Sequence, residues 1–171
     1  MFVDESGFRL LPALVRTWAP RGQTPVLRVP LSWEHLSVIG AITPQGKLYT
    51  WVQERSVKGQ DLVFFLRHLL HHLPGKLLLI WDGLPAHRSQ VVKAFLRAEA
   101  ADRLWLVALP AYAPELNPIE ALWSFLKHVE LKNLCCLSLA QLRAQLRRAI
   151  ERVRHKTNII SACFQQQQCY L

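Results

Sequence analysis

Three carboxylates stand where apolar segments of this chain end or begin. Asp4 follows the short apolar start of the chain, Asp82 closes the run "KLLLIW", and Glu120 lies just after "YAPELNPI". Carboxylate oxygens are preferred ligands of Mg²⁺, and two such ions can activate water and stabilise the leaving oxygen of a phosphodiester. Each acid alone also has an ordinary explanation, because Asp often begins turns and Glu at the third helical position closes a capping box.

The elements that must position these acids are short and alternate in type. Apolar, β-rich runs predict strands at residues 2–5, 36–43, 47–54, 76–82 and 104–110. Apolar spacings of three and four predict helices after residue 59, over 89–100, over 117–132 and from 138 onward. A hairpin-connected start followed by strand–helix–strand units implies an α/β fold, a mixed five-stranded sheet with helices on both faces. Sites in such sheets gather at the carboxyl ends of strands.

Two segments lack this periodicity. Residues 9–29 are punctuated by Pro and Gly and predict a loop or hairpin. The C-terminus, "FQQQQCYL", is a biased polar run. We therefore expect one domain over residues 1–156 and a poorly ordered tail over 157–171.

The charge balance favours a polyanionic partner. Lysine and arginine outnumber aspartate and glutamate by 21 to 12, a formal net charge of +9. Nucleic acid is the first candidate and an acidic membrane surface the second. The sequence contains no apolar run of membrane-spanning length, and its acidic N-terminus is unlike a secretory signal. Its four cysteines match no zinc or disulfide framework, so we expect reduced thiols in a cytoplasmic protein.

Five segments together resemble a known family: "VDESGF", "WAPRGQTPVL", "VIGAI", "LLLIWDGLPAHRS" and "LPAYAPELNPIEALWSFLK". They are similar to the catalytic core of DDE transposases, specifically the mariner-related bacterial insertion-sequence family. The resemblance implies an RNase H-like fold in which Asp4, Asp82 and Glu120 bind two Mg²⁺ ions, with Mn²⁺ as a substitute. It implies cleavage of double-stranded DNA at element ends, transfer to target DNA, a homodimer and association with the bacterial nucleoid.

The resemblance also ranks the neighbours of the three acids. His87 and Arg88 become candidates for contacts to DNA or to Asp82, against ordinary capping and solvation. Lys127 lies two turns beyond Glu120 on the predicted helix and is a candidate phosphate contact. Glu5 should point to the opposite face of its strand by alternation, so we do not expect it to be a ligand.

The sequence departs from the family pattern in two places. Gly83 follows the second Asp where the family commonly has Asn, which removes an amide beside Asp82. The family also carries N-terminal helix-turn-helix segments, whereas this sequence starts almost on the first catalytic strand, so we expect a catalytic half only. Asn117 is sufficiently explained as a helix N-cap, and Trp123 as a core residue.

Three functions remain open at this stage. We expect metal-dependent DNA cleavage and strand transfer during transposition of an insertion sequence. A truncated, non-catalytic remnant that binds DNA or a full-length transposase is the first alternative. An RNase H-type nuclease acting on RNA–DNA hybrids is the second, since it shares the acidic geometry. The arginines of the helix after residue 138 fit either a solvated surface or a DNA contact.

Overall fold

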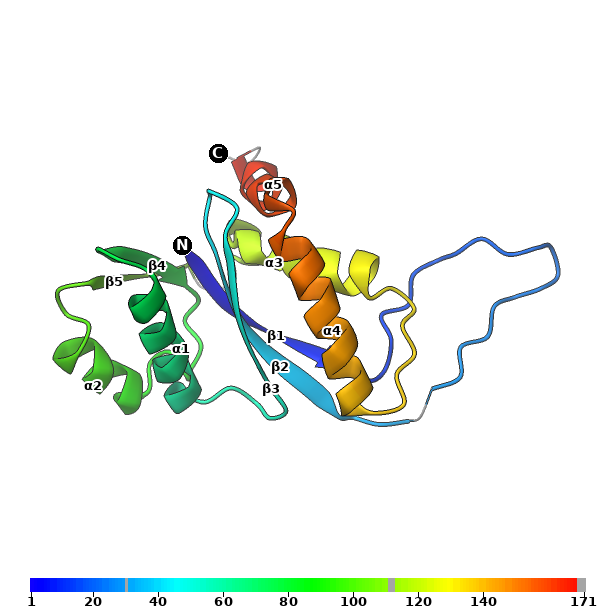
Figure 1. Cartoon of the computed structure of the whole chain (residues 1–171), viewed down its shortest axis with the longest axis horizontal. Coiled ribbons are helices and arrows are strands. Elements are labelled where there is room, and N and C mark those ends of the chain that lie inside the picture. Colours follow the sequence, from blue (N-terminus) through cyan, green and yellow to red (C-terminus); the bar gives the residue numbers. More distant parts are fainter. Residues whose placement is uncertain (30, 111–112, 169–171) are drawn as a thin grey trace.

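Five strands and five α-helices form within the residues that the computed structural model describes, 1–29, 31–110 and 113–168 (Figure 1). The strands are β1 (Phe2–Arg9), β2 (His35–Ile42), β3 (Leu48–Gln53), β4 (Leu77–Trp81) and β5 (Leu104–Ala108). The helices are α1 (Gly59–His72), α2 (Gln90–Ala98), α3 (Pro118–Phe125), α4 (Leu139–Arg154) and α5 (Thr157–Gln168). A 3₁₀ turn, η1 (Pro114–Leu116), precedes α3, and a π-helical turn, η2 (Leu126–Glu130), continues it. Within these residues, no helix combines the length and apolar character needed to cross a membrane.

The strands form a single mixed sheet in the order β3-β2-β1-β4-β5. The β1–β2 and β2–β3 pairs are antiparallel, while β1–β4 and β4–β5 are parallel. This confirms the predicted mixed five-stranded sheet. The central parallel contact is brief, with Phe2 opposite Ile80 as its one register pair among the described residues. The strands therefore separate immediately afterwards, where the candidate acids lie.

Both faces of the sheet are covered, as predicted. Alternate residues of β2 point to opposite sides: Leu36, Val38 and Ile42 pack in the core beneath α3, α4 and α5. Ile39 and Ala41 pack instead in the core beneath α1 and α2. Burial on both faces explains why this strand is a continuous apolar run in the sequence.

The C-terminal prediction is wrong for the part of the tail that the structure describes. Residues 157–168 form α5, which packs beside α3 and α4 (Figure 1). Ile160 and Cys163 are buried in the α3–α5 core, and the ring of Phe164 meets that of Phe2 edge-on at 5.8 Å. Apolar side chains three and four residues apart drive this helix, a spacing that the adjacent glutamine run obscures. Cys169 and the last two residues lie outside the described part.

Residues 11–34, the excursion between β1 and β2, contain no helix or strand in their described part, as the Pro and Gly punctuation predicts. Figure 1 shows them as a long extended loop away from the sheet. Asn133, at a left-handed φ of 54°, anchors the start of the loop. Its side chain accepts from the main-chain N–H of Val15 and donates to the same residue's carbonyl, at 2.8 and 2.9 Å. Beyond this anchor, Trp18 is fully exposed and Trp33 largely so.

Candidate metal centre

A cavity of about 420 Å³ brings the three predicted acids together. Asp4 enters it from β1, Asp82 from the end of β4, and Glu120 from the first turn of α3. The loops around it contribute further lining residues, among them Gly83, Arg88 and Asn117. The sequence therefore identified three acids that the fold gathers at one place.

The register of β1 and β4 explains why the two aspartates meet. Phe2 and Ile80 are partners in the parallel pair, and Asp4 and Asp82 each follow two residues later. Because side chains alternate along a strand, Asp4 points to the face of the sheet that α3 covers, and Asp82, one residue beyond β4, lines the same cavity. The sequence predicted Asp4 at the end of a strand, but β1 continues to Arg9, so this prediction is wrong. Its access to the cavity comes from the separation of β1 and β4.

The start of α3 delivers Glu120 without using it as a cap. Asn117 is the N-cap residue and Pro118 the first helical residue, yet the helix has no side-chain cap hydrogen bond. The Glu120 side chain is exposed and lines the cavity. Asn117 is more than an N-cap, because its Oδ1 atom is buried beside the acids without a hydrogen-bond partner among the described residues. An unsatisfied buried oxygen here is available to a cation or its water.

Burial and negative charge make Asp4 the most perturbed acid of the site. Its side chain is only 4% exposed. Burial, followed by the charge of Glu120, raises the pKa of Asp4 to about 7, although a hydrogen bond from Trp123 opposes the rise. Three carboxylates and one guanidinium, that of Arg88, line the cavity. This oxygen-rich, negatively charged set fits a hard divalent cation, which would relieve the repulsion that raises this pKa.

Trp123 connects the site to the core, a role that the sequence did not reveal. Its Nε1 atom donates a hydrogen bond to Oδ2 of Asp4 at 2.9 Å. Its ring lies against Gly40, the cross-strand partner of Asp4. A Cβ atom at Gly40 would come within 2.5 Å of Cη2 of the indole. The missing side chain therefore creates the space in which Trp123 reaches Asp4.

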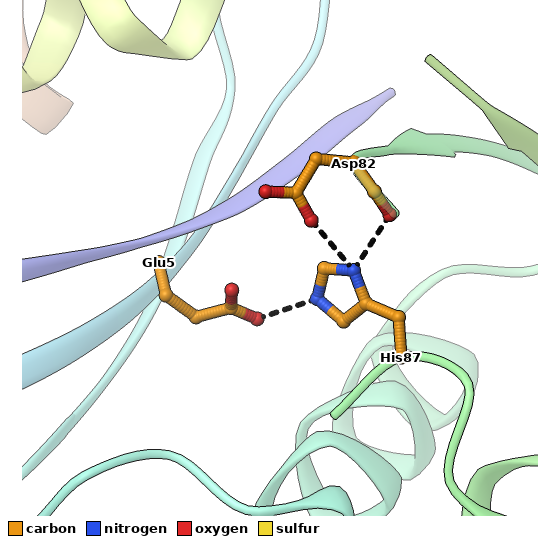
Figure 2. Close-up of side chains that lie close together, drawn as sticks. All are labelled: Glu5, Asp82 and His87. Carbon is orange, nitrogen blue, oxygen red and sulfur yellow. Dashed lines mark hydrogen bonds and ion pairs between the residues drawn. The ribbon is translucent and has the colours of Figure 1, made fainter. Parts of the chain in front are cut away.

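A second group of polar side chains supports Asp82 from the other side (Figure 2). Glu5 points away from the α3 face, as alternation predicted, and its Oε1 atom lies 2.9 Å from Nε2 of His87. The Nδ1 atom of His87 lies 2.8 Å from both Oδ1 and the main-chain oxygen of Asp82. Burial alone would lower the pKa of His87, but the hydrogen bond and charge of Glu5, with those of Asp82, raise it.

The three residues predicted to contact DNA occupy different environments. Arg88 is exposed at the cavity, whereas His87 is buried and has no exposed surface for DNA. Lys127 lies in η2, half-buried, with Nζ 5.4 Å from the centre of the Phe8 ring. Burial lowers the pKa of Lys127, while the charges of Glu120 and Asp4 oppose this change. The charges of Glu120 and Asp4 therefore act on Lys127, which lies over Phe8 on the α3 face of the sheet.

Sequence comparison identifies relatives over most of the chain. The family described as DDE superfamily endonuclease matches residues 1–143. A Shigella sonnei protein, "Insertion element IS630 uncharacterized 39 kDa protein", is 25% identical over 154 residues. The alignment covers 89% of this chain and 44% of that relative. The chain therefore spans less than half the length of this curated relative.

Solved structures share the fold. The crystal structure of the mariner Mos1 paired end complex with Mg matches 98% of this chain and 52% of its own, with a TM-score of 0.71 and 17% identity. The corresponding complex with Mn has a TM-score of 0.64 at 17% identity, covering 99% of this chain and 56% of its own. The crystal structure of the Mos1 transposase catalytic domain has a TM-score of 0.59 at 16% identity, covering 97% and 81% respectively. At these identities the likeness establishes a shared RNase H-like fold.

Proposed function

Because this chain belongs to the DDE superfamily endonucleases, we propose that it is a transposase catalytic domain that cleaves DNA and transfers the cut strand during transposition of an insertion sequence. The observation that carries this proposal is the convergence of Asp4, Asp82 and Glu120 on one cavity. The similar insertion-element protein and the mariner transposase structures support the same activity.

The three acids would hold two Mg²⁺ ions, or Mn²⁺ in their place. The fit rests on the raised pKa of Asp4 and on the unsatisfied oxygen of Asn117 beside it. Similar structures that contain Mg or Mn support a divalent cation. Bound ions would supply Lewis acidity and neutralise charge at a phosphodiester. The protein would contribute rigid oxygen ligands from three separate elements, with Asp4 held in place by Trp123.

Two basic side chains would orient the DNA backbone at the acids. Arg88 lines the cavity and is exposed, so its guanidinium can meet a phosphate entering there. Lys127 lines a different cavity, beside Phe8, but lies near enough to Glu120 and Asp4 for their charges to act on its pKa. Contacts of this kind fix the position of the backbone and carry no sequence information.

A basic groove between β3 and α4 offers a wider surface for duplex DNA. Its volume is about 970 Å³, and four arginines line it: Arg143, Arg147, Arg148 and Arg154. Arg143 pairs with Glu54, and Arg154 with Glu151. Arg147 and Arg148 make no ion pair within the described part of the chain, so their charges are available to phosphates. Binding of this kind would associate the protein with the nucleoid.

We also propose that the acting form is a homodimer. Residues 11–34 expose several large apolar side chains in a loop that the domain does not cover: Leu14, Trp18, Val26, Leu31 and Trp33. An exposed group of this size is typical of a protein–protein interface. The similar mariner structures in paired end complexes are consistent with an assembly that joins two DNA ends.

Nicking of supercoiled plasmid tests the proposed function. We expect the purified chain to nick plasmid with Mg²⁺ or Mn²⁺, and the Asp82→Asn and Glu120→Gln variants to lose nicking while they retain binding in EDTA. Circular dichroism establishes that each variant is folded. Folded wild-type protein that binds DNA but never cleaves it would overturn the proposal in favour of a non-catalytic remnant. Preferential cleavage of RNA–DNA hybrid over duplex DNA would indicate an RNase H-type nuclease instead.

A further inference from the structure

We propose that His87 is a positioning residue, held by Glu5, that orients the Asp82 carboxylate toward the cavity. The three side chains form a continuous chain from the α1–α2 face of the sheet to the candidate metal centre (Figure 2). This inference rests on the proposed function, because it assumes that Asp82 is a metal ligand. It extends that function by giving a positioning role to His87 and Glu5, two residues outside the acidic triad.

The hydrogen bonds define the state of the imidazole. Its Nε2 atom faces the Glu5 carboxylate, and its Nδ1 atom faces two oxygens of Asp82. When both carboxylates are ionised, their oxygens and the Asp82 carbonyl can only accept, and both ring nitrogens then carry hydrogen. In that state His87 donates at both ends, and the negative charge of Glu5 balances the charge of the buried ring.

Asp82 needs such support because little else holds its side chain. It lies one residue beyond β4, its side chain is 36% exposed, and Gly83 follows it. The main-chain N–H of Leu84 also donates to Oδ1, at 3.1 Å. Oδ1 thus receives both donors, which leaves Oδ2 as the oxygen available to a cation. Fixing one oxygen in this way reduces the entropy that a ligand loses on binding.

His87 is itself held firmly. Its ring stacks on that of Trp81 at 4.2 Å, with only 2° between the planes. Its main-chain N–H donates to the carbonyl of Leu84 at 3.0 Å, within the turn that joins β4 to α2. The side chain is buried, so solvent does not compete for its hydrogen bonds. The ring can therefore transmit the position of Glu5 to Asp82.

The same three residues could instead form a metal site, since one ligand atom from each lies within 4.8 Å of the others. Two observations disfavour this reading. Both ring nitrogens already lie within hydrogen-bond distance of oxygens of Glu5 and Asp82, so a metal would have to replace one of these contacts. The imidazole also lies beneath Asp82, away from the cavity that opens to solvent.

A matched pair of substitutions at His87 tests the proposal. The amide nitrogen of Asn superposes on Nδ1 and that of Gln on Nε2, so His87→Asn keeps the donor to Asp82 and His87→Gln keeps the contact to Glu5. Both variants lose the stacking on Trp81 equally. We expect His87→Gln, which loses the donor to Asp82, to weaken Mn²⁺ affinity by about 10- to 100-fold, and His87→Asn, which keeps that donor, to retain most of it. Mn²⁺ binding is followed by electron paramagnetic resonance, independently of cleavage.

Three outcomes decide the matter. Equal loss in His87→Asn and His87→Gln would mean that the ring acts only through packing, and would overturn the proposal. Stoichiometric Zn²⁺ binding by the wild type that disappears in Glu5→Ala would show the three residues to be a metal site, and would also overturn it. Asp82→Asn tests the proposed function separately from the role of His87. If this variant binds Mn²⁺ with wild-type affinity, the proposed function itself fails. DNA binding in EDTA should be unchanged in all of these variants.

Discussion

The indole of Trp123 donates to Asp4 over 2.9 Å, although 119 residues separate them in the sequence. Trp123 is also part of the apolar core beneath α3, α4 and α5. One side chain therefore belongs to the core and to the candidate metal centre. Changes to packing on this face of the sheet should therefore alter the position and the pKa of Asp4.

Trp123→Phe should keep most of the apolar packing but remove the donor to Asp4. Since that hydrogen bond lowers the pKa of Asp4, its loss should raise the pKa further and move Mn²⁺ binding to higher pH. The unsatisfied acceptor should also cost about 1–3 kcal/mol of unfolding free energy. Mn²⁺ titrations between pH 6 and 9 measure the shift. An unchanged pH profile, with Trp51→Phe as the surface control, would contradict the coupling.

Asp4→Asn should stabilise the metal-free protein at alkaline pH. The pKa of Asp4 is about 7 in the folded chain and near 3.8 when unfolded, so the unfolded state loses its proton first as pH rises. Wild-type stability should fall between about pH 4 and 7, by at most on the order of 4 kcal/mol, and stay low above pH 7. The variant should lack this loss. Urea unfolding in EDTA at pH 5 and pH 8 tests it; an equal gain at both values would refute the explanation.

Gly40→Ala should damage the site through packing alone. The new Cβ would lie 2.5 Å from the Trp123 ring, which must move away from Asp4. We expect a loss of about 1–3 kcal/mol in stability, with weakened Mn²⁺ binding. Gly7→Ala is the matched control, because a Cβ on that β1 residue meets open space. Thermal unfolding and Mn²⁺ titration of the two variants should differ; similar behaviour would argue against the close contact.

The double variant Arg147→Ala/Arg148→Ala should bind duplex DNA more weakly and with less dependence on salt. If both arginines contact phosphates, the slope of log affinity against log salt should decrease in magnitude by about 1.8. Fluorescence anisotropy between 50 and 300 mM salt gives this slope. Arg97→Ala, an exposed residue on α2, is the control. A slope equal to that of the wild type would exclude the β3–α4 groove as a DNA surface.

Gly83→Asn should fold normally and strengthen metal-dependent cleavage. A Cβ atom at this position would meet no other atom within 4 Å, and Gly83 lines the same cavity as the acids. An amide there can donate to or accept from groups around Asp82, whereas the methyl of Gly83→Ala cannot. Plasmid nicking by both variants distinguishes the amide from added bulk. A rise with Ala as large as with Asn would contradict the role of the amide.

The sequence predicted the sheet, the cover on both faces and the gathering of Asp4, Asp82 and Glu120, because strand runs and helix spacings are local signals. It could not predict the contact between Glu5 and His87. Alternation gave the face to which Glu5 points, but its partner lies 82 residues away and depends on the turn after β4.

The errors have similar physical causes. The helical spacing in α5 was masked by a polar run, and burial of Ile160 and Cys163 against the sheet outweighs that composition. The predicted single helix to residue 132 is interrupted, since α3 passes into a π-helical turn at Leu126. Tertiary packing determines both the formation of α5 and the π-helical turn after α3, and residue spacing alone predicts neither feature.

The extended loop between β1 and β2 should make the chain open to limited proteolysis without loss of its architecture. Arg16, Arg21 and Arg28 lie there in exposed backbone without helix or strand, which suits trypsin. A cut at these sites would leave β1 hydrogen-bonded to β2 along its whole length and to β4 at its start. The short N-terminal fragment and the long remainder should therefore stay together as a nicked protein, and could be supplied separately as complementing fragments.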